Sequence, residues 1–381
     1  MSNRLRDKVA VVGVGCSQFG ELYEKSAEDL ICDAVDEALA DAGCDRQRIE
    51  AAWVGNQVSP YCGDALADAL KLFGRPMTRV QNYCASGMDA FRNACAAVAA
   101  GLHDVVLTVG FEKMRDGGFG RPNRGHPVID FGERAPHVFA LSANRYFAKY
   151  GASKKTLAAV AVKNHQNGTK SPKAHLKMLV NEEMVLKAPM IYSPLGLFDC
   201  CQTTDGAAAV VVCRADLARE FTDAPVWPLG IGLAVVSGQP CFQPSNDFVG
   251  FDATVQASAQ AYKQAGVTPA DVDFAEVHDC FTITEILNYE DLGFCARGEG
   301  GKFVEEGRAS LDGEKPVNPS GGLKSYGHPI GATGVRMIYE LVTQLRGRAG
   351  GRQVRHAKIG LAHNLGGPGA VSCVSILTNQ G

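Results

Sequence analysis

Short runs of β-branched and aliphatic residues alternate along this chain with longer segments whose apolar positions recur at helical spacing. Continuous apolar runs of this length, bounded by glycine or polar residues, are typical of strands buried on both faces. We expect such strands at residues 9–15, 104–110, 207–213, 357–362 and 370–377.

Amphipathic helices are predicted between these runs. Residues 27–43 (AEDLICDAVDEALADAG) carry apolar residues three and four positions apart and end at a glycine, and residues 334–347 (GVRMIYELVTQLRG) repeat that design. A terminal glycine is a common helix stop because it takes the left-handed backbone conformation without steric cost. The alternation predicts an α/β fold in which helices cover a largely buried sheet.

The chain also contains an internal repeat. Residues 43–56 (GCDRQRIEAAWVGN) match residues 266–279 (GVTPADVDFAEVHD) in pattern, and each segment follows a helix that ends in Ala-Gly. Further along, the predicted helix and strand within 84–110 have their counterpart within 331–362. Two related α/β halves are the simplest explanation.

The composition between the two halves shifts to polar and basic residues. We therefore divide the chain into an N-terminal half, an inserted loop domain and a C-terminal half, and place them at residues 1–114 (continuing with 201–225), 115–200 and 226–381. The basic run at 163–177 (KNHQNGTKSPKAHLK) is either a solvated face or a docking surface for an anionic ligand such as a nucleotide phosphate.

Composition and charge narrow the class of protein. A chain of 381 residues exceeds one hydrophobic core, and its net charge of -3 gives no basic footprint for nucleic acid. The 13 cysteines include no C-x-x-C pair, which argues against disulfide frameworks and zinc ribbons and favours the cytoplasm. The first apolar run is too short for a signal peptide or a membrane span. We expect no resident metal.

Cys84 is the first candidate for chemistry. It lies in QNYCASGMDA (81–90), directly before a segment of small residues that continues as a helix. A helix N-terminus favours the thiolate through its dipole and its free N–H groups, which is one way in which a cysteine becomes a nucleophile. The alternative is a small buried hydrophobic residue, the ordinary role of cysteine in a core.

His328 is the second candidate, in the glycine-rich loop SGGLKSYGHPIGATG (320–334). The repeat places this loop where the other half has Cys84, so the two residues would face each other at the junction of the halves. A cysteine beside a histidine base is the pair that nucleophilic acyl transfer needs. A phosphate-binding turn is the alternative, but the Lys-Ser/Thr end of a P-loop is missing.

Two further motifs stand at predicted strand ends. In EVHDCF (276–281), alternation along the strand points His278 and Cys280 the same way. In LAHNLGGPGA (361–370), His363 is followed by glycines that can present bare backbone N–H groups to an oxyanion.

Together these four stretches resemble the thiolase superfamily over nearly the whole chain. In that family the nucleophilic cysteine lies in a C-A-S-G type of motif, matched by Cys84, and the activating histidine lies in G-H-P, matched by His328. The resemblance implies a five-layered α-β-α-β-α core made of two pseudo-equivalent halves with an inserted loop domain.

The third and fourth motifs resemble one branch of that family, the sterol-carrier-protein type of thiolase. Its HDCF replaces Asn-Glu-Ala-Phe, and HNLGG replaces Cys-x-Gly, so that the second cysteine of most thiolases falls at His363. The branch implies that Cys280 supplies the missing thiol and that His278 replaces the asparagine of an oxyanion hole.

The implied reaction is cleavage of a 3-oxoacyl-CoA by coenzyme A, as in β-oxidation-like degradation, or its reverse. Cys84, activated by His328, attacks the keto carbon, and Cys280 or His363 protonates the departing carbanion. His278 and His328 would hold the thioester oxygen, and the N–H groups of Cys84 and Gly366 the tetrahedral intermediate. CoA is expected as a co-substrate, with no covalently bound cofactor.

Several alternatives remain open. A condensing synthase of the same fold or a retro-aldol lyase would act on CoA thioesters, and Tyr326, where many thiolases have lysine, is compatible with the lyase. A non-catalytic acyl-CoA-binding subunit belongs to another class. The acyl group is bulky, branched or aromatic as readily as acetoacetyl. The resemblance further implies a homodimer or tetramer and permits a small zinc-ribbon and OB-fold partner protein.

Overall fold

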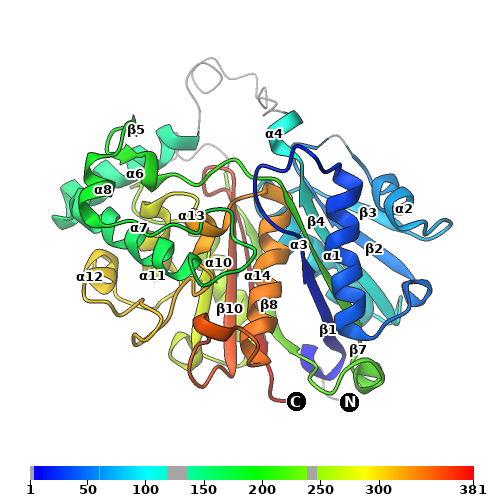
Figure 1. The fold of residues 1–381 in the computed structure, drawn as a ribbon. Helices are drawn as coiled ribbons and strands as arrows, with labels where there is room; N and C mark the ends of the chain where they lie inside the picture. The colour runs from blue at the N-terminus through cyan, green and yellow to red at the C-terminus, as the bar shows by residue number, and fades with distance from the viewer. Residues whose placement is uncertain (1–3, 60, 118–134, 238–246) are drawn as a thin grey trace.

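Two β-sheets lie on either side of a central pair of helices in the computed structural model, which describes residues 4–59, 61–117, 135–237 and 247–381 (Figure 1). The first sheet has the order β1-β7-β4-β2-β3 and the second has the order β8-β11-β10-β9. The strands are β1 (Val9–Cys16), β2 (Ala51–Gly55), β3 (Met77–Val80), β4 (Val105–Glu112), β7 (Gly206–Arg214), β8 (Trp227–Val235), β9 (Phe274–Val277), β10 (Ile359–Gly366) and β11 (Val371–Thr378).

Helices complete the five layers that the sequence predicts. Helix α1 (Ala27–Ala42) covers the outer face of the first sheet with α2 (Asp64–Leu70) beside it, α3 (Ser86–Ala99) and α14 (Ile330–Leu345) fill the centre, and α10 (Asp252–Ala265) covers the second sheet. The α-β-α-β-α arrangement is therefore confirmed. Shorter helices outside the segment between β4 and β7 are α9 (Ala218–Phe221), α11 (Thr282–Asp291), α12 (Gly300–Glu305) and α13 (Gly322–Tyr326). Single 3-10 turns lie at Leu5–Asp7, Arg46–Arg48, Leu197–Asp199, Ala215–Leu217, Pro269–Asp271 and Gly350–Arg352.

The internal repeat is visible in how the two halves protect equivalent sheet edges. Asp41 and Glu37 of α1 accept hydrogen bonds from backbone N–H groups of β1 at 3.0 and 2.9 Å. Gln264 and Gln260 of α10 accept from β8 at 2.7 and 3.2 Å. In each half the two acceptors lie four residues apart on one helix face, so unpaired edge groups are satisfied by side chains.

Glycines bring the central helices into backbone contact. A Cβ atom at Gly87 of α3 would lie 2.3 Å from the carbonyl oxygen of Gly331 in α14, and one at Gly110 of β4 would lie 2.2 Å from the same oxygen. A Cβ at Gly331 would in turn lie 2.4 Å from the carbonyl oxygen of Gly55. No side chain fits at these three positions, which explains the small residues after Cys84 and His328.

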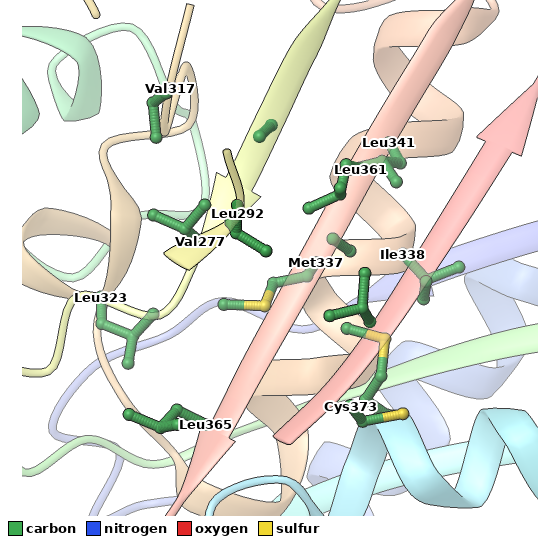
Figure 2. Packing of buried hydrophobic residues seen from close by; sticks show 14 of the residues in the cluster. Val277, Leu292, Val317, Leu323, Met337, Ile338, Leu341, Leu361, Leu365 and Cys373 are labelled. Atoms are coloured by element: carbon green, nitrogen blue, oxygen red, sulfur yellow. The ribbon is translucent and has the colours of Figure 1, made fainter. Parts of the chain in front are cut away.

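The largest hydrophobic cluster extends through both halves, and Figure 2 shows the part of it between α14 and the strands of the second half. Met337, Ile338 and Leu341 of α14 pack with Leu361 of β10 and Val277 of β9, and all five are fully buried. The strong apolar stripe of α14 thus becomes its packing face, as the sequence pattern predicts. This core fixes the ends of β9 and β10, from which three of the candidate residues project.

The segment between β4 and β7 carries α4 (Met114–Gly117), α6 (Ala135–Tyr150), α7 (Lys154–Gly168), α8 (Glu182–Lys187), β5 (Met190–Tyr192) and β6 (Leu195–Gly196). Its extent as a separate domain stays a prediction. The basic run at 163–177 is not uniformly solvated, because Lys163 is buried against Glu285 at 2.8 Å. Lys173 pairs with Glu37. Docking of an anionic ligand on this run is untested.

Strand β10 runs four residues past the predicted end at 362, through His363 and Asn364 to Gly366. His363 and Asn364 are polar, so the apolar run in the sequence ends before them and predicts a strand shorter than the real one. Every residue from 360 to 366 is nevertheless buried. Within the described ranges no helix is both long and apolar enough to cross a membrane.

Candidate active site

A tight turn presents Cys84 between β3 and α3. Tyr83 takes a left-handed φ of 51°, which is strained for an aromatic residue and is common at functional sites. Ser86 holds the turn, since its Oγ donates to the Tyr83 carbonyl at 2.5 Å and accepts from the N–H of Asn82 at 2.9 Å. Cys84 therefore lies two residues before the first residue of α3, as the sequence predicts.

The other glycine-rich motif packs directly against this turn. A Cβ at Gly366 would lie 2.6 Å from the carbonyl oxygen of Asn82, so only glycine fits. The backbone N–H that reaches the Cys84 sulfur belongs to the next residue, Gly367, which favours the thiolate. The expected oxyanion role of the Gly366 N–H stays a prediction.

Cys84, His278 and His328 converge. The Cys84 sulfur and one ring nitrogen of each histidine lie within 4.8 Å of one another. The two imidazoles meet edge to face, with ring centroids 5.1 Å apart and planes at 82°. His278 follows the last residue of β9, and His328 lies between α13 and α14. Residues separated by more than 240 positions in the sequence are thus brought to one point.

Hydrogen bonds fix the tautomer of His328. Its Nδ1 lies 2.7 Å from Oγ1 of Thr333, and that hydroxyl gives its only proton to the carbonyl oxygen of Pro329 at 3.0 Å. We infer that the Thr333 oxygen accepts, so that Nδ1 of His328 carries the proton. Its Nε2 has a free lone pair and, among the described residues, no hydrogen-bond partner. This nitrogen is suited to accept a proton.

His278 has the opposite arrangement. Its Nδ1 lies 3.1 Å from the amide nitrogen of Asn364, a group that can only donate. Nδ1 of His278 is therefore the acceptor, and its proton is on Nε2. The pair thus offers one lone pair, on His328, and one N–H, on His278.

Cys280 is buried close to the cluster and outside its tightest part. Burial raises the pKa of the Cys280 thiol, and the nearby thiols of Cys201 and Cys84 add to this effect. The carbonyl of Cys280 accepts a hydrogen bond from the N–H of Cys201 at 2.9 Å. Asp279 points away, toward the start of α13, where its carboxylate accepts from the N–H of Leu323 at 2.6 Å. The alternation expected for HDCF is present, with His278 and Cys280 directed to the same region.

His363 lies on the other face of the second sheet. Its Nε2 is 3.0 Å from Oγ1 of Thr254 in α10, whereas its neighbour Asn364 faces His278. Its Nδ1 has no hydrogen-bond partner. Successive residues of a strand project to opposite faces, so His363 points toward α10 while Asn364 points toward His278, and an acid-base role for His363 stays a prediction.

Burial keeps the cluster neutral. Burial raises the pKa of the Cys84 thiol to about 12, even though the Gly367 N–H favours the thiolate. Burial, assisted by the Arg336 cation, lowers the pKa of His328 to about 3, and the pKa of His278 is also well below its usual range. The helix N-terminus alone thus does not produce a resting thiolate. The resting pair is a thiol and an imidazole, and the proton must move when substrate is bound.

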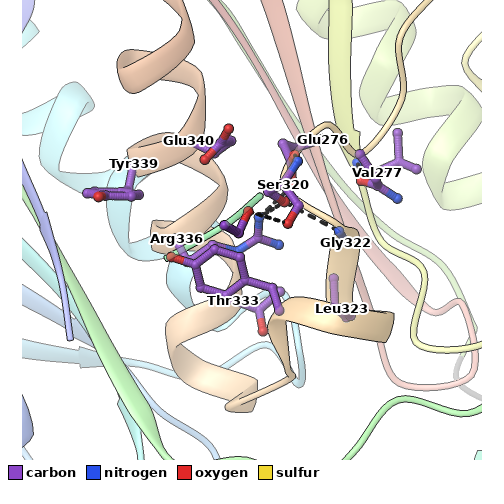
Figure 3. A network of polar contacts seen from close by, with 12 residues as sticks. Glu276, Val277, Ser320, Gly322, Leu323, Thr333, Arg336, Tyr339 and Glu340 are labelled. Atoms are coloured by element: carbon purple, nitrogen blue, oxygen red, sulfur yellow. Dashed lines mark hydrogen bonds and ion pairs between the residues drawn. The ribbon is translucent and has the colours of Figure 1, made fainter. Parts of the chain in front are cut away.

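The Arg336 cation is part of a buried polar network that includes Glu276 and Ser320 (Figure 3). Its Nη1 donates to Glu276 at 2.5 Å and to Oγ of Ser320 at 2.8 Å. Its guanidinium carbon lies 4.8 Å from the ring centroid of Tyr326. Arg336 thus adds a fixed positive charge, which disfavours protonation of both imidazoles in the resting state.

The cluster contains metal-ligand types at close spacing, but it is not arranged as a metal site. A ligating histidine offers a lone pair and donates through its other nitrogen. His328 meets this condition, whereas Nδ1 of His278 accepts from Asn364, so its Nε2 presents a proton.

Three residues in this arrangement were not selected from the sequence: Thr333, Asn364 and Gly367. Thr333 lies five residues after His328, in the first turn of α14, a position that could have revealed it.

Comparison with known families gives one consistent result. Residues 9–216 match the family model described as thiolase, N-terminal domain, and residues 236–379 match the model described as thiolase C-terminal domain-like. The chain is 43% identical over 385 residues to an acetyl-CoA acetyltransferase of Methanothermobacter thermautotrophicus, covering 98% of this chain and 100% of the relative.

Other relatives carry different names. Sterol carrier protein 2 of Gallus gallus is 35% identical, over 96% of this chain and 71% of that protein. The benzoylsuccinyl-CoA thiolase subunit BbsB of Thauera aromatica is 35% identical, over 96% of each chain. Among solved structures, the Ltp2-ChsH2(DUF35) aldolase is 25% identical with a TM-score of 0.89 over 99% of both chains. A human mitochondrial 3-ketoacyl-CoA thiolase in complex with CoA, at 20% identity and a TM-score of 0.75 over 99% of both chains, shares the fold.

Proposed function

Because this chain belongs to the thiolase family, within its sterol-carrier-protein-type branch, and is an enzyme acting on acyl-CoA, we propose that Cys84 carries the acyl group while a 3-oxoacyl-CoA is cleaved by coenzyme A. The observation that carries this proposal is the convergence of the Cys84 sulfur with two histidine nitrogens within 4.8 Å. The described hydrogen bonds leave one of these histidines a base and the other a donor.

The first half-reaction follows from those protonation states. Nε2 of His328 accepts the proton of Cys84, and the thiolate attacks the 3-keto carbon of the substrate. The bond between C2 and C3 breaks, the acyl group remains on the sulfur, and the electron pair moves onto the thioester enolate. Nε2–H of His278 and the newly protonated Nε2 of His328 stabilise that enolate oxygen.

The second half-reaction restores the enzyme. Cys280 protonates C2 of the enolate, which leaves as a shorter acyl-CoA, and the Cys280 thiolate takes the proton of the incoming CoA thiol. The CoA sulfur attacks the acyl carbon on Cys84, and the Cys84 sulfur departs as a thiolate and takes back its proton from Nε2 of His328. N–H groups of Cys84 and Gly366 are assigned to the tetrahedral intermediate. The same steps in reverse give condensation.

The acyl group is proposed to be bulky, branched or aromatic. Supporting this is the likeness to the benzoylsuccinyl-CoA thiolase subunit, whose name includes an aromatic acyl group. The likeness to sterol carrier protein 2 is compatible with it. Acetoacetyl-CoA is the reference substrate, because an acetyl-CoA acetyltransferase is also among the relatives.

A retro-aldol lyase is the second candidate, favoured by the structural likeness to the Ltp2-ChsH2(DUF35) aldolase. A lyase needs no acyl-enzyme, so the Cys84 and His328 pair would have no role in it. The same likeness supports the proposal of a small DUF35-type partner protein. A homodimer is also proposed, and light scattering of the purified protein should give twice 40.4 kDa.

The test is to incubate the protein with acetoacetyl-CoA and with bulkier 3-oxoacyl-CoA esters, with and without CoA, while thioester loss is followed. Intact-mass spectrometry should find an acyl adduct that is absent from a Cys84→Ala variant and is discharged by CoA. Cleavage without CoA and without any adduct would support the lyase. Binding without turnover, alone and with the DUF35-type protein, would support a non-catalytic acyl-CoA-binding subunit.

A further inference from the structure

We propose that Asn364 is a positioning residue that holds His278 as the Nε2–H tautomer, and so divides the work of two otherwise similar histidines. The inference rests on the proposed function, because the oxyanion that His278 serves is that of the thiolase reaction. It gives the functional role within the HNLG motif to Asn364 rather than to His363.

The geometry gives Asn364 one polar contact. Its amide nitrogen lies 3.1 Å from Nδ1 of His278, and its Oδ1 has no hydrogen-bond partner. Gly334 of α14 confines the amide, since a Cβ there would lie 2.4 Å from Oδ1 of Asn364. Asn364 is fully buried in β10, so packing holds the plane of its amide, and in the structure the amide nitrogen is the atom directed at the imidazole.

A neutral imidazole has one proton, so what Asn364 does at Nδ1 decides what Nε2 can do. With the amide donating, Nε2 of His278 carries the proton and can stabilise an oxyanion. Thr333 imposes the reverse on His328, whose Nε2 is left as a base. Without this pair of contacts the two imidazoles, 5.1 Å apart in centroid distance and both neutral, would have no reason to differ.

The decisive substitution is Asn364→Asp, which keeps the size of the side chain and replaces the donor with a carboxylate. The carboxylate accepts from Nδ1–H, so neutral His278 would lose its proton at Nε2. We expect kcat at pH 8 to fall about 10²- to 10³-fold with KM little changed, the loss typical of removing one oxyanion donor. Asn364→Ala, which imposes neither tautomer, should lose less.

The pH profile separates this role from a structural one. The new carboxylate raises the pKa of His278, and below that pKa the imidazolium carries protons on both nitrogens. The activity of Asn364→Asp relative to wild type should therefore rise as the pH is lowered from 8 to 6, whereas Asn364→Ala should keep a constant ratio. A packing role predicts the contrary order, with the isosteric Asp variant more active than Ala and no recovery at low pH.

A second measurement needs no Asn364 variant. Solid-state NMR of protein labelled with ¹⁵N-histidine, with His278→Gln and His328→Gln for assignment, should find the proton of His278 on Nε2 and that of His328 on Nδ1. The same tautomer for both would overturn the inference, as would an Asp variant as active as wild type. Absence of turnover or adduct in wild type would instead count against the proposed function and leave the NMR result to decide this one.

Discussion

Arg336 and Glu276 form an ion pair in which neither side chain is exposed, with Nη1 and Oε2 2.5 Å apart. The pair joins α14 to β9, and its cation lies near both histidines of the cluster. Burying these two charges costs desolvation energy, which their mutual attraction offsets. Removing either Arg336 or Glu276 would leave the charge of the other buried and uncompensated.

Replacing Arg336 with Met should therefore destabilise the protein by about 3–5 kcal/mol, the cost expected when one member of a buried pair is removed. Urea unfolding followed by circular dichroism measures this. The double variant Arg336→Met/Glu276→Gln should recover most of the loss, since it leaves no unpaired charge. Equal stability of the single and double variants would contradict the interpretation.

One pair of variants distinguishes Cys280 from His363 as the general acid. Cys280→Ala should reduce cleavage of the 3-oxoacyl-CoA by about 10²- to 10⁴-fold, the range for loss of a general acid. His363→Gln should stay within a few-fold of wild type, because His363 contacts Thr254 on the opposite face of the sheet. Steady-state kinetics with acetoacetyl-CoA decides between them, and the reverse ranking would return the acid-base role to His363.

His363 should instead affect stability in acid. Burial lowers its pKa from 6.5 to about 3, so between these values the unfolded chain binds a proton that the folded chain does not. Stability then falls as the pH drops below 6.5, and this residue contributes up to about 1.4 kcal/mol per pH unit. Denaturant unfolding of His363→Gln between pH 6.5 and 4 should give a shallower slope by about that amount. His356→Gln, at an exposed position, is the matched control and should leave the slope of wild type.

Gly331→Ala tests the packing of α14 against the first sheet. The added methyl would meet the carbonyl oxygen of Gly55 at 2.4 Å, a backbone atom that cannot easily move. We expect a loss of at least about 1–3 kcal/mol, as for overpacked cores, together with a large loss of turnover. Gly351→Ala, where a Cβ would meet nothing within 4 Å, should leave both thermal stability and activity unchanged.

The fold was accessible from the sequence because its signals are local. Apolar runs gave β1, β4, β7, β10 and β11, and the Ala-Gly helix ends at 42–43 and 265–266 take left-handed glycines in the structure. Spacing in the sequence also led to the convergence of Cys84 with His328, because the repeat relates their loops.

The finer roles were not accessible, because they depend on which face a residue takes. His363 is the more reactive side chain of the HNLG motif, and the sequence favours it over Asn364. The choice was made by the register of β10 against β9, where His363 pairs with Val277 and Asn364 therefore faces His278. Likewise, burial outweighs the helix N-terminus at Cys84, and burial is a property of the whole fold.

The glycine contacts between α3 and α14 also bear on motion. Cys84 precedes one of these helices and His328 the other, and the helices touch through backbone atoms with no side chain between them. Such a contact leaves no room for α3 and α14 to slide or rotate past each other, so the two halves form one rigid unit and do not open and close. The gap between sulfur and imidazole is then a fixed dimension of the molecule. Any adjustment to substrates of different bulk must come from the peripheral loops, leaving the reacting atoms undisturbed.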